Sequence, residues 1–164
     1  MARFLIIGCG CRGRTLARAL VERGHTVRGT TRDPDRVGEI EAAGAEAVVA
    51  DPDRVGSLAD ALGHVSAAVL LLGSAQGSAE ALRELHGPRL KALLTRMVDT
   101  TVHGVVYEAR GTVDPDLLRA GADELKAFGG RSRARVAVLE ADPGAPEVWL
   151  EEAISRAEAV LAAS

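Results

Sequence analysis

The chain has 164 residues, of which 47% are hydrophobic and 26% charged, and its formal net charge is −3. This length and balance predict one folded domain, and the slightly negative charge excludes the basic surface typical of a nucleic-acid partner. Aromatic residues make up only 2% of the chain, which argues against base-stacking surfaces. We expect a cytoplasmic protein with no membrane partner, because the N-terminus does not resemble a signal peptide and no segment has the length of a transmembrane helix.

The first expected strand, residues 3–7, ends at a glycine-rich turn that reads G-x-G-x-x-G and precedes an expected helix over residues 13–23. In this pattern the first glycine permits a tight turn, the second lets backbone approach a pyrophosphate, and the third brings the helix close to the strand. The N–H groups at the helix N-terminus attract an anion. The loop therefore predicts a dinucleotide site with five contributing residues: Gly8, Gly10, Cys11, Arg12 and Gly13.

Two cysteines lie in this loop, Cys9 and Cys11. They are too close in sequence for an ordinary disulfide, and no Cys or His stands at ligand spacing from them, so we expect no metal site. The simplest interpretation is two small side chains in the turn, one of which faces the core.

The rest of the chain alternates between expected strands and helices without a linker or a repeat. The further strands are predicted over residues 26–31, 47–50, 66–72, 105–107 and 134–139. The further helices are predicted over residues 33–44, 51–62, 74–86, 89–98, 114–128 and 146–163, with an interruption at Gly87-Pro88. This alternation predicts an α/β fold over residues 1–164, a single domain with a doubly wound, parallel six-stranded sheet in the order 3-2-1-4-5-6.

The end of the second strand selects between two cofactors. A carboxylate there binds the ribose hydroxyls of NAD, whereas neutral and basic groups accept the 2′-phosphate of NADP. The chain reads Thr30-Thr31-Arg32-Asp33, and the guanidinium of Arg32 suits a phosphate, with Arg12 closing on it from the glycine loop. We favour NADP(H) over NAD(H), although Asp33 keeps NAD open if the strand ends one residue later.

Other cofactor contacts are expected where the third and fourth strands end. Asp51 either accepts a hydrogen bond from the adenine amino group or caps the following turn. Leu72 and Gly73 end the fourth strand, at the crevice outside the carboxyl edge of the sheet. Ser74 and Gln76 follow and are candidates for lining the same crevice on the substrate side.

Several runs of this chain resemble atypical short-chain dehydrogenase/reductase-like NAD(P)-binding proteins, including NAD-dependent epimerase/dehydratase-like and NAD(P)H-binding members. The runs are residues 5–10 (LIIGCG), 16–20 (LARAL), 24–27 (GHTV) and 31–34 (TRDP), and the likeness is clearest over residues 3–73. The resemblance implies a Rossmann fold and a bound NAD(P). Glu140 stands where the family usually carries an arginine near the substrate.

The resemblance also implies catalysis by a Tyr-x-x-x-Lys pair assisted by a Ser or Thr, in which the lysine lowers the pKa of the tyrosine. The only tyrosine here is Tyr107, and Gly111 rather than lysine follows four residues later. The nearby alternatives are Glu108 as a base, Thr112 as a hydroxyl and Arg110 as a holder of an anionic substrate. We favour a structural interpretation over these roles, in which Tyr107 packs under a helix and Glu108 and Arg110 are paired or solvated.

Three functions fit these features. The first is an NADP(H)-dependent oxidoreductase or epimerase-like enzyme for an unidentified small molecule. The second is a non-catalytic NADP(H)-binding redox sensor or partner subunit, favoured by the missing Tyr-x-x-x-Lys pair and by the expected lack of a substrate domain. The third is an S-adenosylmethionine-binding, methyltransferase-like protein, which the basic end of the second strand disfavours. A homodimer is also expected, through the apolar helices over residues 89–98 and 148–163.

Overall fold

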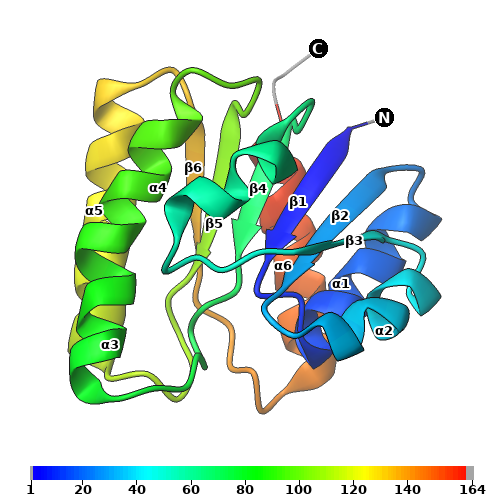
Figure 1. Cartoon of the computed structure of the whole chain (residues 1–164), viewed down its shortest axis with the longest axis horizontal. Coiled ribbons are helices and arrows are strands. Elements are labelled where there is room, and N and C mark those ends of the chain that lie inside the picture. The colour runs from blue at the N-terminus through cyan, green and yellow to red at the C-terminus, as the bar shows by residue number, and fades with distance from the viewer. Residues whose placement is uncertain (1, 162–164) are drawn as a thin grey trace.

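A computed structural model of the chain describes residues 2–161 and shows a parallel sheet between two layers of helices (Figure 1). The strands are β1 (Arg3–Ile7), β2 (Thr26–Thr31), β3 (Glu46–Val49), β4 (Ala67–Leu70), β5 (Gly104–Glu108) and β6 (Arg135–Leu139). All five pairings are parallel, in the order β3-β2-β1-β4-β5-β6. The predicted doubly wound α/β sheet and its strand order are confirmed.

Within the part of the chain that the structure describes, six α-helices connect and follow the strands. They are α1 (Cys11–Glu22), α2 (Val37–Ala42), α3 (Ala79–Glu84), α4 (Leu90–Met97), α5 (Pro115–Arg131) and α6 (Pro146–Ala159). The helix expected over residues 51–62 is wrong, because that segment forms two short 3₁₀ turns, Val55–Leu58 and Asp60–Leu62. The last residues of the helix expected up to 163 lie partly outside the described residues. Among residues 2–161, no helix has both the length and the apolarity needed to cross a membrane.

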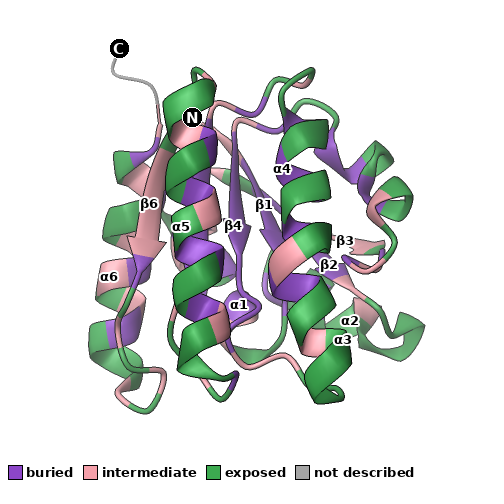
Figure 2. Cartoon of the chain, turned by 90° about the vertical axis from the view of Figure 1, so that its left-hand side faces the viewer, coloured by how far each residue is buried: buried purple, intermediate pink, exposed green. Residues whose placement is uncertain are grey.

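Both faces of the sheet are covered, which explains why β4 and β5 are buried along their whole length. On one face, apolar residues of α1, α2 and α6 form a cluster with β1. On the other face, α4, α5 and the two 3₁₀ turns supply the covering residues, and Figure 2 shows the exposed sides of α4 and α5 turned outward. Burying one Leu, Val or Phe side chain stabilises a fold by about 1.5–3 kcal/mol, so these layers hold the sheet edge rigidly.

The expected break at Gly87-Pro88 is wrong. Helix α3 continues into α4 through a π turn, Leu85–Arg89, which contains Pro88. Proline lacks an N–H and clashes with the preceding helical turn, and a wider π turn absorbs that clash without ending the helix. The turn also buries the side chain of His86, which is 2% exposed.

Helix α6 buries one narrow stripe of side chains. Val148 is 61% exposed, whereas its neighbour Trp149 is 2% exposed. The buried stripe of α6 runs through Trp149, Ala153 and Ala157, at a spacing of four residues, and this places Val148 outside the stripe. Val98, after α4, is also exposed. A homodimer through these helices stays a prediction.

Candidate functional site

The site begins at the glycine loop between β1 and α1. Gly8 has a φ of +83°, and a Cβ atom there would lie 2.5 Å from the carbonyl oxygen of Leu71, so only glycine fits the turn. The side chain of Thr30 secures the loop, because its Oγ1 accepts a hydrogen bond from the Gly8 N–H at 3.2 Å. The Cys9 N–H donates to the Thr30 carbonyl at 2.9 Å.

Helix α1 starts directly after this turn with its N-terminal N–H groups available. Its N-cap residue, Gly10, makes no side-chain cap, and the first turn carries no acidic residue. A Cβ atom at Gly10 would meet nothing within 4 Å, whereas one at Gly13 would lie 3.3 Å from Ile6 and Cys9. Gly10 therefore leaves open space above the helix end, and Gly13 lets α1 pack closely on β1, as the pattern predicts.

A cleft of about 460 Å³ lies at the carboxyl ends of β1, β2 and β4, beside this helix end. Of the residues predicted to contact cofactor or substrate, the cleft is lined by Gly8, Gly10, Cys11, Arg12, Gly13, Thr30, Thr31, Arg32, Leu72, Ser74 and Gln76. The helix that follows β4 supplies apolar walls through Ala81, Leu82 and Leu85. The crevice therefore opens where parallel α/β sheets hold their ligands.

The cleft ends near β2 in two exposed arginines, Arg32 and Arg36. Arg36 was not among the predicted contacts; its basic side chain, five residues after the end of β2, is the one feature of the sequence that could have indicated it. The Asp33 carboxylate does not line the cleft: its Oδ1 accepts from the Asp35 N–H at 2.9 Å and caps the 3₁₀ turn Pro34–Arg36. Arg36 pairs with Glu39 at 3.3 Å and with Asp33 at 3.9 Å, whereas Arg32 has no ion pair among residues 2–161. Arg32 is therefore the main source of positive charge at this end of the cleft.

Two predicted contacts lie beside the cleft, not along it. The Asp51 carboxylate accepts a hydrogen bond from the Asp53 N–H at 2.9 Å, which is the capping arrangement, and Asp53 lines the cleft in its place. Gly73 lies against Glu108, and a Cβ atom on it would come within 2.9 Å of a Glu108 carboxylate oxygen. Asp51 and Gly73 therefore support the walls of the cleft and do not line it.

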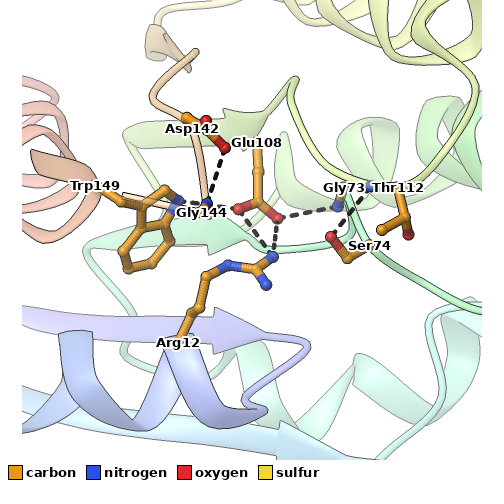
Figure 3. Close-up of polar contacts among 8 residues, drawn as sticks. All are labelled: Arg12, Gly73, Ser74, Glu108, Thr112, Asp142, Gly144 and Trp149. Atoms are coloured by element: carbon orange, nitrogen blue, oxygen red, sulfur yellow. Dashed lines mark hydrogen bonds and ion pairs between the residues drawn. The ribbon is translucent and has the colours of Figure 1, made fainter. Parts of the chain in front are cut away.

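A second group of residues gathers at the carboxyl ends of β4 and β5, and Figure 3 shows them converging on one carboxylate. We call Arg12, Gly73, Glu108 and Trp149 the Glu108 cluster. Arg12 Nη2 donates to both Glu108 oxygens, at 2.9 and 3.0 Å. The Gly73 N–H donates to Oε1 and the Trp149 indole N–H donates to Oε2, both at 3.1 Å.

Burial is uneven within this cluster. The Glu108 side chain is 0% exposed, while that of Arg12 is 30% exposed and lines the cleft. The Arg12 guanidinium carbon lies 5.6 Å from the centre of the Trp149 ring, within cation–π range. A fully hydrogen-bonded, paired carboxylate is the arrangement that burial requires. The structure therefore pairs Arg12 with Glu108, and the Trp149 indole N–H donates a further hydrogen bond to the same carboxylate.

Tyr107 points to the opposite face of the sheet from Glu108, as strand alternation predicts. Its hydroxyl lies 2.6 Å from His86 Nδ1 in a fully buried pair. Burial raises the pKa of Tyr107 and lowers the pKa of His86, since it penalises the charged form of each. The phenol contacts α5 at Gly121 and does not line the cleft. This is the packing interpretation offered for Tyr107.

The remaining candidates lie on loops near the Glu108 cluster. Ser74 Oγ accepts a weak hydrogen bond from the Thr112 N–H at 3.3 Å, and the Thr112 side chain is exposed. Arg110 pairs with Asp142 at 3.5 Å on the surface. Neither Thr112 nor Arg110 lines the cleft.

The two cysteines divide as expected, since Cys9 is buried and Cys11 exposed. Burial raises the pKa of the Cys9 thiol to about 11, despite the opposing influence of Arg14. Within residues 2–161 no group of three or more His, Cys, Asp or Glu side chains is placed to hold a metal ion.

A family model described as NAD(P)H-binding matches residues 8–128, most of the chain. The chain belongs to this NAD(P)H-binding family. Its match starts at the first glycine of the loop and runs to the end region of α5, so it includes the cleft and the Glu108 cluster apart from Trp149. No curated protein matches the sequence.

Several solved structures share this fold. A short-chain dehydrogenase/reductase superfamily protein from Agrobacterium tumefaciens with bound NAD has a TM-score of 0.68 at 21% identity, over 84% of this chain and 48% of that one. BdcA from E. coli has a TM-score of 0.73 at 19% identity, over 95% of this chain and 90% of that one. UDP-glucuronic acid 4-epimerase from Bacillus cereus, in complex with NAD, has a TM-score of 0.68 at 12% identity, over 85% and 56%. The chain thus spans about half the length of the first and third of these proteins, and the likeness establishes the fold.

Proposed function

We propose that this NAD(P)H-binding family member binds NADP(H) in the 460 Å³ cleft, in preference to NAD(H). The observation that carries the proposal is the pair Arg32 and Arg36 at the β2 end of the cleft, combined with an Asp33 carboxylate that caps a turn. Guanidinium groups can bind a 2′-phosphate, and one oxygen of the Asp33 carboxylate is already engaged in capping the turn. The uncapped N-terminus of α1 supplies N–H donors for the pyrophosphate.

The residues present fit such a ligand at three points. Gly10 leaves the space above α1 free of side-chain atoms, the apolar residues of α3 face the same cleft, and the arginines supply positive charge. When bound, NADP(H) supplies a hydride donor or acceptor. The chain's own contribution in this proposal is to bind, orient and neutralise the phosphates.

Calorimetric titration with NADPH and NADH tests the proposal. We expect NADPH to bind more tightly than NADH, and Arg32→Ala with Arg36→Ala to reduce the NADPH affinity by about tenfold per arginine while changing NADH little. The exposed Arg119, which pairs with Asp116 on α5, supplies the matched control Arg119→Gln. Equal affinities for both dinucleotides in the unmodified protein would refute the NADP preference. Binding of S-adenosylmethionine but of neither dinucleotide would refute the whole proposal.

A second candidate function, a non-catalytic NADP(H) sensor or partner subunit, is favoured by the placement of the acid–base candidates. Tyr107 is buried against His86, and Glu108 is buried against Arg12. Among the described residues that line the cleft there is no Tyr, His, Lys or Glu, and the one carboxylate is Asp53. Turnover of NADPH with a panel of carbonyl substrates distinguishes the two roles: steady oxidation at 340 nm would contradict the sensor, and tight binding without turnover would support it.

A further inference from the structure

Arg12 and Glu108 form a charge pair in which only the cation faces the cleft. Arg12 lines the cleft with its side chain 30% exposed, and Glu108 stands behind it with no exposure. Both oxygens of Glu108 accept hydrogen bonds from protein donors. Of the Arg12 nitrogens only Nη2 donates to them, at 2.9 and 3.0 Å. The Nε atom of Arg12 is buried and has no hydrogen-bond partner within residues 2–161. A ligand in the cleft therefore meets the positive end of this pair.

The pair lies at a specific part of the crevice. A Rossmann sheet has two mononucleotide-binding halves, and the β2 end, here marked by Arg32, takes the adenosine ribose. Arg12 instead reaches toward the carboxyl end of β5, where Glu108 and Gly73 hold it (Figure 3). This is the half that remains for the nicotinamide mononucleotide. Moving Arg12 across to a 2′-phosphate would leave the buried Glu108 carboxylate unpaired, so the pairing keeps Arg12 in place.

The two forms of the cofactor differ at the nicotinamide by one charge. The oxidised ring carries a positive charge and the reduced ring is neutral, so a neighbouring guanidinium disfavours the oxidised form. We infer that Arg12 makes the protein discriminate between redox states and prefer the reduced dinucleotide, with Glu108 as a positioning residue that limits the effect. The inference rests on the proposed function, because it needs the dinucleotide to occupy this cleft.

Changes at the two residues act in opposite directions. Replacing Arg12 by a neutral side chain removes the repulsion of the oxidised ring, whereas replacing Glu108 by a neutral one removes the charge that offsets Arg12. A purely structural role in shaping the cleft would change the affinity for both redox forms alike. The ratio of the dissociation constants for NADP⁺ and NADPH is therefore the informative quantity.

Calorimetry on Arg12→Met, Arg12→Lys, Glu108→Gln and the control Arg119→Gln measures this ratio. We expect the unmodified protein to bind NADPH more tightly, Arg12→Met to lower the NADP⁺/NADPH ratio about fivefold, and Arg12→Lys to preserve it. Glu108→Gln is expected to raise the ratio. Emission from Trp149, the only tryptophan, reports whether each variant keeps the Glu108 cluster folded, and if Glu108→Gln unfolds, the Arg12→Met and Arg12→Lys pair decides the question alone.

The possible results distinguish failure of this inference from failure of the proposed function. Binding of both forms with a ratio that Arg12→Met leaves unchanged overturns the inference and leaves the proposed function standing. A ratio that moves the same way in Arg12→Met and Glu108→Gln also overturns it. If the unmodified protein binds neither dinucleotide, the proposed function fails first and the inference with it.

Discussion

Replacing Arg12 by methionine should destabilise the fold, because Arg12 is the only charged partner of the buried Glu108 carboxylate among residues 2–161. Glu108 keeps the Gly73 and Trp149 N–H donors but loses both contacts from Arg12 Nη2. Breaking a buried ion pair by removing one partner costs about 3–5 kcal/mol. Because the Arg12 side chain is 30% exposed, water can reach part of the vacated space. We therefore expect a loss of about 2–3 kcal/mol in the free energy of unfolding.

Urea denaturation followed by Trp149 emission measures this loss. We expect a lower urea midpoint, with the slope of the unfolding free energy against urea concentration unchanged. In thermal unfolding of a chain of this size, the same loss corresponds to a fall in Tm of about 5–10 °C. Removing both charges in Arg12→Met/Glu108→Gln should cost less than the sum of the single changes, with a coupling of about 1 kcal/mol or more. The exposed pair at Arg119 provides a control expected to change stability by under about 0.5 kcal/mol. Additive single changes, or a loss for Arg12→Met as small as that of the control, would refute the reasoning.

Three further outcomes follow from single features of the structure. Burial lowers the pKa of His86 below its usual 6.5, so in acid the folded protein binds fewer protons there than the unfolded chain. Stability should therefore fall as the pH drops below about 6.5. Urea midpoints at pH 7.5 and 5.5 measure this fall, and an equal fall in His86→Gln would contradict it. At pH 8 a thiol reagent should label Cys11 rapidly and leave Cys9 unlabelled until urea is added, because burial raises the pKa of Cys9 to about 11; two fast equivalents in the folded state would speak against this. Gly8→Ala should cost about 2–3 kcal/mol in thermal or urea unfolding, because its φ is +83° and its Cβ would lie 2.5 Å from a backbone oxygen; wild-type stability would show that the loop relaxes freely.

Periodic features made the fold predictable. Buried parallel strands are continuous apolar runs, and the helices between them carry apolar stripes, so strand number and order followed from the sequence. The errors fall where local signals conflict with packing. Pro88 is a strong local signal for a break, yet the buried stripe of α4, which includes Leu90 and Leu94, keeps the helix against the sheet. Residues 51–62 carry a capping signal but have too little helical periodicity for more than 3₁₀ turns.

The sequence predicted the parts of the candidate site that are formed by the backbone. It predicted less well which side chains pair with one another. The glycine loop and the carboxyl ends of β1, β2 and β4 follow from topology, so about half of the residues that line the cleft were among the predicted contacts. Arg12 was expected to close on a 2′-phosphate, and the structure pairs it with Glu108, 96 residues away in sequence. Such a pairing depends on the three-dimensional register of β5 and α1. Trp149 joins the same carboxylate from α6, and no short-range pattern links these positions.

The π turn between α3 and α4 has a consequence for how this chain tolerates insertions and deletions. A π turn holds one residue more than the α-helical turn that it replaces, so it behaves as a one-residue insertion in an otherwise regular helix. Deleting Gly87 would let the segment close into a regular α-helix, with Leu90 and Leu94 still on the face that packs against the sheet. Pro88 would then lie inside an α-helical turn, where its ring clashes with the preceding turn. The extra residue is therefore what allows a proline within this helix, and we expect the deletion to be tolerated only when Pro88 is replaced as well.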